Sequence, residues 1–84
     1  MHTSVRALAV RFDEHVMWVD LEDGRTLGVP LAWFPRLSNG SAAERSEVVI
    51  SPSGLHWDSL DEDISIAGLL AGRGDQTRTK AHAA

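Results

Sequence analysis

The amino-acid sequence predicts a small α+β domain in which a mainly antiparallel sheet of about five short strands and two helices form two layers. Short segments rich in β-forming residues recur between turn signals, as they do in antiparallel sheets. Two helical patterns accompany them, a short one in the middle of the chain and an apolar one near its C-terminal end. With 84 residues, the chain is long enough for one such domain.

Two segments near the N-terminus alternate between apolar and polar residues, as strands do. In the first segment, residues 5–12, three apolar side chains share one face: Leu8, Val10 and Phe12. A turn at residues 13–15 separates it from the second segment, residues 16–21, which is rich in β-forming residues. The two segments therefore predict an antiparallel pair, the start of a meander that continues to Val29.

The loop length of the next hairpin determines its register, and only one loop length places the apolar side chains of both strands on the same face. A two-residue loop of Asp23 and Gly24 would mix polar and apolar side chains on the same face. A three-residue loop with Gly24 in the left-handed conformation gathers the apolar side chains into two facing pairs, Val19 with Leu27 and Met17 with Val29. The same register sets Trp18 opposite Gly28, a stabilising pair because the ring covers the glycine. We therefore predict the three-residue loop.

Two prolines limit the middle of the chain. Pro30 ends the third strand, and Pro35 cannot donate a hydrogen bond within a helix and keeps the residue before it out of helical angles. Residues 31–37 therefore predict a tight helical turn or an irregular connection, and residues 38–40 a loop. Residues 41–44, Ser-Ala-Ala-Glu, fit a capping box and predict the start of a short helix.

The second half of the chain predicts two further strands and the C-terminal helix. The strands cover residues 47–51 and 55–57, with a turn at residues 52–54 between them. Three apolar residues then fall at helical spacing: Ile66, Leu69 and Leu70. Gly72 is placed as the residue that ends this helix.

Composition limits the classes of function. Residues 1–72 are predicted to form the single domain, and residues 73–84 a disordered polar tail. The net charge at pH 7 is −4, and because the tail holds three basic residues and one acidic residue, a charge of +2, the domain carries −6. An acidic domain repels phosphates, so direct nucleic-acid binding is disfavoured.

The expected location is the cytoplasm. The chain has no cysteine, so that disulfides and thiolate metal sites are excluded and a reducing compartment is the default. The N-terminus lacks the pattern of a signal peptide, and the longest apolar run is too short to span a bilayer. No association with a membrane is expected.

Residues 56–63 combine a histidine, a tryptophan and four acidic residues. The carboxylates could bind a hard cation together with His56, but the spacing and the internal glycine of an EF-hand are absent. Acidic side chains just before a helix also cap its N-terminus, which is the interpretation that we favour. Since neither a nucleophile motif nor a phosphate loop accompanies His56, a hydrogen-bonded structural role is expected for this residue.

The large aromatic side chains are expected mainly in the core, because ring burial dominates the energetics of a small domain. Trp33 and Phe34 are adjacent, so in an extended segment they point in opposite directions, which would place one of them at the surface. An exposed tryptophan near an arginine, here Arg36, is typical of a protein–protein interface. Of the two interpretations, burial in the core is the one that we favour, and an exposed interface residue is the alternative.

Six short motifs occur in a fixed order: Asp23-Gly24-Arg25, Val29-Pro30-Leu31, Trp33-Phe34-Pro35-Arg36-Leu37, Glu44-Arg45, Gly54-Leu55-His56-Trp57 and Leu60-Asp61-Glu62-Asp63-Ile64. Together they resemble a bacterial family catalogued as a domain of unknown function, number 2442, over nearly the whole predicted domain. The resemblance implies a two-layer α+β fold without accepted catalytic residues. It also implies regulation or partner binding, because some relatives carry a helix-turn-helix domain and others are encoded beside a second small protein, as toxin–antitoxin pairs are.

The leading interpretation is a non-enzymatic interaction or regulatory domain, an acidic, antitoxin-like partner of a small neighbouring protein. A homodimer is a further option, because a thin core and free sheet edges favour association. No catalytic, metal-binding or cofactor-binding residue is expected. The expected partner-binding residues are Trp33, Phe34, Arg36, His56, Trp57, Asp61, Glu62 and Asp63. Two alternatives stay open: a transcription-associated regulatory domain, and a metal-dependent enzyme that uses His56 and the nearby carboxylates.

Overall fold

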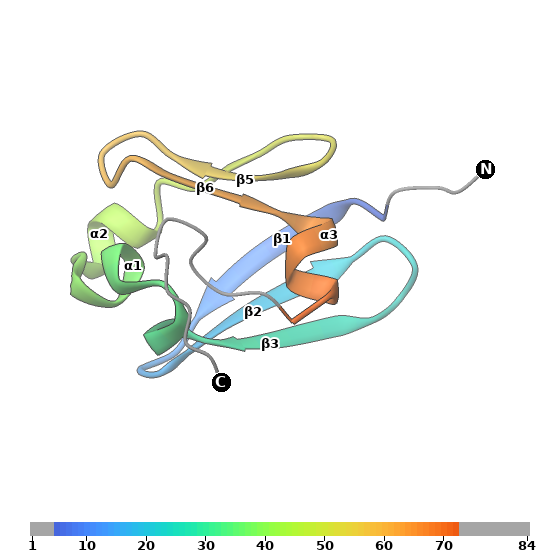
Figure 1. Ribbon diagram of the computed structural model, residues 1–84, viewed down its shortest axis with the longest axis horizontal. Coiled ribbons are helices and arrows are strands. Elements are labelled where there is room, and N and C mark those ends of the chain that lie inside the picture. Colours follow the sequence, from blue (N-terminus) through green and yellow to red (C-terminus); the bar gives the residue numbers. More distant parts are fainter. Residues whose placement is uncertain (1–4, 73–84) are drawn as a thin grey trace.

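The computed structural model describes residues 5–72 and shows two antiparallel sheets of three strands each, one above the other in Figure 1. The first sheet has the order β1 (Ala7–Phe12), β2 (Val16–Leu21), β3 (Thr26–Pro30). The second has the order β4 (Val49–Ile50), β5 (Gly54–Trp57), β6 (Glu62–Ser65). The predicted α+β class is confirmed. The predicted single sheet of about five strands is wrong, because six strands form two separate sheets.

The predicted register of the first sheet is confirmed. The hydrogen bond from the Leu21 N–H to the Arg25 carbonyl, 2.8 Å long, closes a three-residue loop in which Gly24 has a φ of 96°. The apolar pairs then face each other as expected, Val19 with Leu27 and Met17 with Val29. On the other face Trp18 lies opposite Gly28, so closely that a Cβ on the glycine would lie 2.6 Å from the indole ring.

The first strand departs from the predicted alternation at Leu8. Ala7 pairs with Leu21 and Ala9 with Asp20, so that the register shifts at a β-bulge between the two alanines. A bulge leaves its extra residue outside the ladder and changes which side chains face the core. Ala7 is therefore buried, whereas Leu8 is 64% exposed, and the prediction that Leu8 shares one face with Val10 and Phe12 is wrong.

The connection between the sheets is made of short helical segments. It contains η1 (Leu31–Trp33), α1 (Pro35–Asn39) and α2 (Ala42–Arg45). Pro35 occupies the first turn of α1 and the preceding residue has a φ of −130°, as the proline requires. The predicted tight turn is confirmed, although α1 also includes two residues of the predicted loop at 38–40.

The predicted capping box of α2 is present. The Glu44 N–H donates to the Ser41 hydroxyl oxygen at 3.1 Å, and the Ser41 N–H donates to the Glu44 carboxylate at 2.9 Å. These two bonds satisfy backbone donors that the short helix cannot satisfy itself. The β4 strand that follows is limited to Val49–Ile50, shorter than the predicted strand over 47–51.

The acidic corner does not begin a helix, and here our prediction is wrong. Residues 62–65 form β6, paired with β5, and their side chains alternate between buried and exposed. The last helix, α3 (Ile66–Leu70), is capped by Ser65, whose hydroxyl accepts the Gly68 N–H at 2.9 Å, and its first turn contains no acidic residue. Gly72 ends it as predicted, with a φ of 79°. The predicted tail at 73–84 lies outside the described residues.

One core joins the two sheets, the helical connection and α3. Its buried apolar residues come from all of these parts: Ala7, Met17, Val19, Leu21, Val29, Leu31, Phe34, Leu37, Leu55, Trp57, Ile64, Ile66 and Leu69. Between β5 and β6 the backbones approach so closely that a Cβ on Gly54 would lie 2.5 Å from the Ile64 carbonyl oxygen. The position of the β5–β6 hairpin therefore depends on a glycine at this point.

Replacement of Gly54 by alanine should lower the free energy of unfolding by about 2 kcal/mol or more, because the methyl group meets backbone that cannot rotate away. Urea denaturation of Gly54→Ala measures the loss. The neighbouring Ser53→Ala, at an exposed position, is the matched control. Equal stability of the Gly54 variant and the wild type would contradict this account of the hairpin.

The Ser65→Ala substitution should lower the free energy of unfolding by about 1 kcal/mol, the usual contribution of an N-terminal helix cap. Thermal unfolding followed by circular dichroism measures this loss, with Ser38→Ala in the exposed face of α1 as the control. If Ser65→Ala leaves the free energy of unfolding unchanged while removal of the Asp61 carboxylate lowers it by about 1 kcal/mol, the acidic residues would be the cap of the helix.

Candidate functional site

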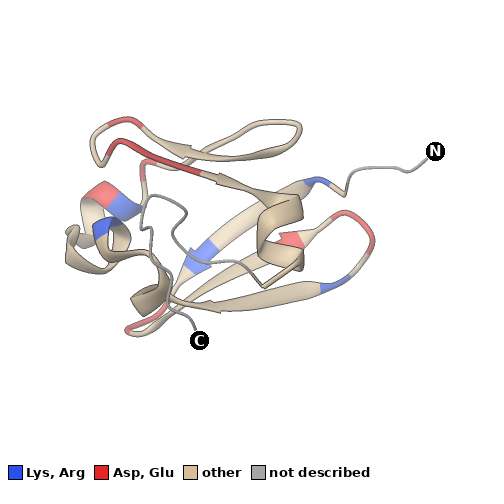
Figure 2. Cartoon of the chain, viewed as in Figure 1, with Lys and Arg blue, Asp and Glu red and all other residues tan. Residues whose placement is uncertain are grey.

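Charge is distributed unevenly over the described residues. All five basic residues of this part lie between positions 6 and 45, where six acidic residues leave a net charge of −1. Residues 46–72 contain five acidic residues and neither lysine nor arginine, and hence carry −5. Figure 2 shows this separation, with red segments but no blue ones on the β5–β6 hairpin. The second sheet therefore carries most of the negative charge of the domain.

Four carboxylates form what we call the acidic hairpin surface, defined by Glu47, Asp58, Asp61 and Asp63, all exposed. Three of them belong to the β5–β6 hairpin. Its turn is closed by a hydrogen bond of 3.2 Å from the Asp61 N–H to the Asp58 carbonyl. Asp61 has a φ of 51°, a left-handed conformation that aspartate tolerates better than most residues. The fourth is joined to the turn by a bond of 3.2 Å from the Ser59 hydroxyl to Glu47.

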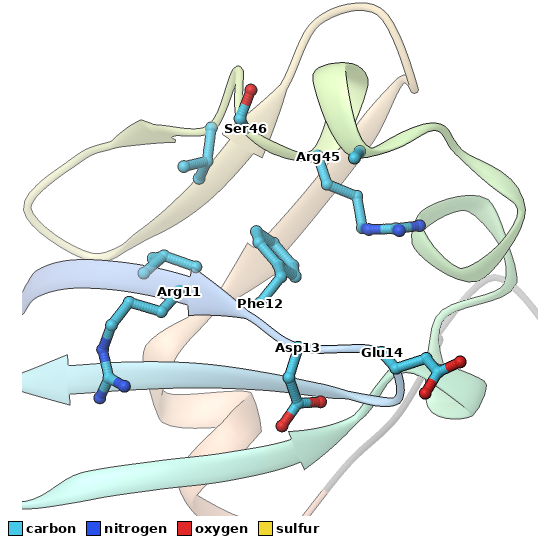
Figure 3. Close-up of a pocket in the computed structure, with 9 residues that line it drawn as sticks. Arg11, Phe12, Asp13, Glu14, Arg45 and Ser46 are labelled. Atoms are coloured by element: carbon cyan, nitrogen blue, oxygen red, sulfur yellow. The ribbon is translucent and has the colours of Figure 1, made fainter.

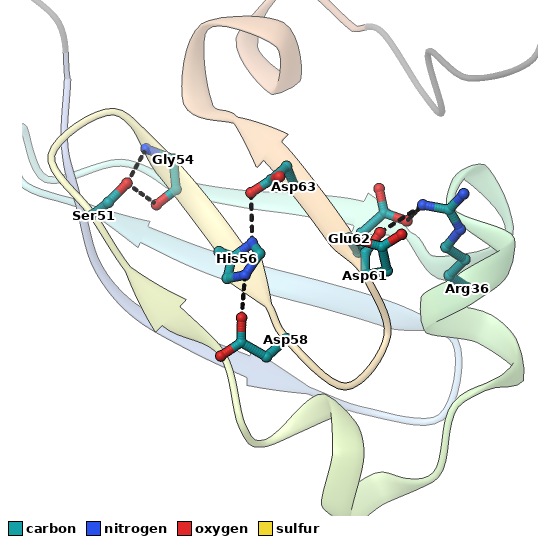
Figure 4. A network of polar contacts seen from close by, with 8 residues as sticks. All are labelled: Arg36, Ser51, Gly54, His56, Asp58, Asp61, Glu62 and Asp63. Carbon is teal, nitrogen blue, oxygen red and sulfur yellow. Dashed lines mark hydrogen bonds and ion pairs between the residues drawn. The ribbon is translucent and has the colours of Figure 1, made fainter.

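His56 lies between two of these carboxylates (Figure 4). Its Nδ1 is 2.6 Å from Asp63 Oδ1, and its Nε2 is 2.5 Å from Asp58 Oδ1. Only the imidazolium form can donate from both nitrogens at once. Hydrogen bonds to Asp58 and to Asp63 therefore raise the pKa of His56 above its ordinary value of 6.5. The histidine thus holds together two like charges that would otherwise repel each other.

The same geometry does not form a metal site. The two carboxylates contact different nitrogens, so they lie on opposite sides of the imidazole ring instead of converging with it on one point. In residues 5–72, no three histidine, aspartate or glutamate side chains are arranged to hold one ion. The structure therefore offers the metal-dependent alternative no converging ligand set within this range.

Arg36 connects α1 to the turn of the hairpin. Its Nη1 donates to the Asp61 carbonyl oxygen at 2.6 Å and lies 3.9 Å from Glu62 Oε1 (Figure 4). The Glu62 side chain is buried and Arg36 is partly exposed, so the contact places a cation at the entrance to a buried carboxylate. This arginine anchors the acidic hairpin surface to the helical connection.

The predicted partner-binding residues differ in exposure and in location. Phe34, Trp57 and Glu62 are buried, and because they are inside the folded domain they cannot form a binding surface. His56, Arg36, Asp61 and Asp63 come together at the hairpin, whereas Trp33, 40% exposed, lies in η1 next to the end of β3. Among the predicted partner-binding residues at positions 33–36, Arg36 is therefore the one that reaches the acidic hairpin surface.

Two residues of this surface, Glu47 and Asp58, are not among the predicted partner-binding residues. The sequence does place Asp58 among the carboxylates near His56, because it stands two positions after the histidine, a spacing that allows contact across the end of a strand. Glu47 is eleven positions away from Asp58 along the chain and offered no such signal. Its place depends on the hydrogen bond with Ser59 described above.

Comparison with known proteins gives a family and two solved structures. A family model described as "Protein of unknown function (DUF2442)" matches residues 7–75. The chain is similar to a protein of unknown function from Rhodospirillum rubrum, with 34% identity over 89% of this chain and 95% of that one, and a TM-score of 0.76. It is also similar to an uncharacterized protein from Chromobacterium violaceum, with 25% identity over 86% and 70% of the two chains and a TM-score of 0.73.

No curated protein matches the chain. The described helices are all too short to cross a membrane.

The raised pKa of His56 predicts that stability falls with increasing pH. Its contribution is complete below the unfolded-state pKa of about 6.5 and is lost as the pH rises through the higher folded-state value. Urea midpoints measured between about pH 5.5 and about pH 8.5 should therefore decrease, and His56→Gln should flatten this decrease. A wild-type midpoint that rises over this range, or a His56→Gln profile as steep as the wild type's, would refute the assignment.

Proposed function

The chain belongs to the DUF2442 family of proteins of unknown function, and from that premise we propose that it is a non-enzymatic interaction domain. Its acidic hairpin surface would bind a basic partner protein in the way that an antitoxin binds a small toxin. The observation that carries this proposal is the separation of charge, with −5 concentrated in residues 46–72.

Electrostatics supports a basic partner. A surface of one sign attracts a partner of the opposite sign over a distance of about one Debye length, which speeds association and makes it dependent on salt. The same surface repels nucleic acid, since phosphates carry the wrong charge for it. A cationic protein surface is therefore the complement that best fits the hairpin.

The carboxylates are also held in place before binding. Asp58 and Asp63 are joined through His56, and the Asp61 backbone is fixed by Arg36. Side chains that are already ordered lose less conformational entropy when a partner binds. The hairpin thus presents two carboxylates that His56 holds and a third on a turn whose backbone Arg36 fixes, which favours a specific complex over diffuse ionic attraction.

The proposal is tested with the product of the adjacent gene, co-expressed with this chain and purified through a tag on one of the two. We expect a complex whose dissociation constant increases about tenfold or more in Asp63→Lys at physiological salt. The matched control is Glu14→Lys, because the two side chains have nearly equal exposure, 82% for Asp63 and 86% for Glu14, while Glu14 lies in the turn between β1 and β2. The charge change is the same in both variants.

Two results would count against the proposal. If no complex forms in repeated co-purification, the product of the adjacent gene is not the partner. If both lysine variants weaken binding equally, the total charge of the domain, and not the hairpin, determines binding. Asp63→Asn separates the loss of a carboxylate from the addition of a cation. It should weaken the complex less than Asp63→Lys does.

A further inference from the structure

A cleft lies between the end of β1 and α2, apart from the acidic hairpin surface (Figure 3). Its volume is about 520 Å³, within the range of small-molecule sites. Its apolar lining comes from both elements and from the segment that leads to β4: Val10, Phe12, Ala42 and Val48. Neither the predicted site residues nor the proposed partner surface includes any part of it.

Two of the four charged residues around the cleft, Arg11 and Asp13, do not face it. In Figure 3, Phe12 points toward α2, whereas Arg11 and Asp13 point to the opposite side of β1, as the alternation of a strand requires. Arg11 is paired there with Asp20 at 2.9 Å. Asp13 accepts a hydrogen bond of 3.0 Å from the Trp18 indole N–H, and this bond contributes most to lowering its pKa.

The other two charged residues are Glu14, an exposed side chain in the turn after β1, and Arg45, which borders the apolar part of the cleft at Phe12. Its guanidinium lies 6.0 Å from the centre of the Phe12 ring, and its Nη1 donates to the carbonyls of Leu37 at 2.8 Å and Gly40 at 2.6 Å. Among the described residues, no carboxylate forms an ion pair with it and its buried Nε–H has no acceptor. A partly buried cation without a counter-charge is costly, and an anion that enters the cleft would supply one.

We propose that this cleft binds a small organic acid with an apolar body, its carboxylate directed toward Arg45 and its apolar part against Phe12 and Val48. The guanidinium provides the charge that recognises a carboxylate, and the neighbouring ring and aliphatic side chains provide the apolar surface. The cleft is too small for a folded partner, and Arg45 is the cation next to its apolar part. This site is independent of the partner-binding function proposed above.

Phenylacetate is a suitable probe, and phenylacetamide is its neutral counterpart of nearly the same shape. Titration of the isotope-labelled protein, followed by amide chemical shifts, should show changes confined to the end of β1, to α2 and to the residues just after it. We expect phenylacetate to bind about tenfold or more tightly than phenylacetamide, the usual value of a charge-assisted contact. Comparing two ligands on one protein tests the charge without a change at Arg45, whose removal could unfold the domain.

Two alanine positions in α2 provide the matched variants. Ala42 lines the cleft and is exposed, so Ala42→Leu should fill it and abolish binding of phenylacetate while the fold is retained. Ala43 is also exposed but does not line the cleft, so Ala43→Leu should bind as the wild type does. Equal affinity for the acid and the amide, shifts centred on the β5–β6 hairpin, or undiminished binding by Ala42→Leu would each overturn the proposal.

Discussion

The burial of Trp57 is the constraint on which the rest of the domain depends. This side chain is completely buried, and its indole N–H donates to the Arg45 carbonyl at 2.9 Å. The guanidinium of the same arginine binds the Leu37 and Gly40 carbonyls at the end of α1. A buried donor without an acceptor would be costly, so that β5 and the helical connection can only pack in the arrangement that supplies one. Both the acidic hairpin and the cleft at α2 are positioned by this pair.

The two sheets handle charge in different ways, and this difference underlies both proposals. On the outer face of the first sheet, Asp20 is paired with Arg11 at 2.9 Å and accepts the Thr26 hydroxyl at 2.9 Å. The second sheet has no lysine or arginine of its own; His56 bridges Asp58 and Asp63, and Arg36 from α1 lies 3.9 Å from the Glu62 carboxylate. An excess of negative charge therefore remains at the surface there, while beside the first sheet Arg45 has no carboxylate partner among residues 5–72.

The β2–β3 hairpin of the first sheet could be predicted because the alternation of apolar and polar side chains along its strands is compatible with only one register. Once Met17 and Val29 must share a face, the loop at Gly24 can have only one length, and the structure agrees. The acidic corner could not be predicted in the same way. Glu62 is a charged residue at a buried position, which hides the alternation of β6, and four acidic residues before an apolar run predict a helix cap instead.

The sequence alone determined the local features that depend on neighbouring residues: the capping box at Ser41, the break at Pro35, the three-residue loop at Gly24 and the charge that separates the two halves of the chain. Tertiary structure alone decided which side chains meet over long separations. The contact of Arg36 with Asp61, and the lack of a counter-charge for Arg45 within the described part of the chain, result from packing between elements far apart in sequence. Local preference extends over a few residues, whereas burial is a property of the whole assembled core.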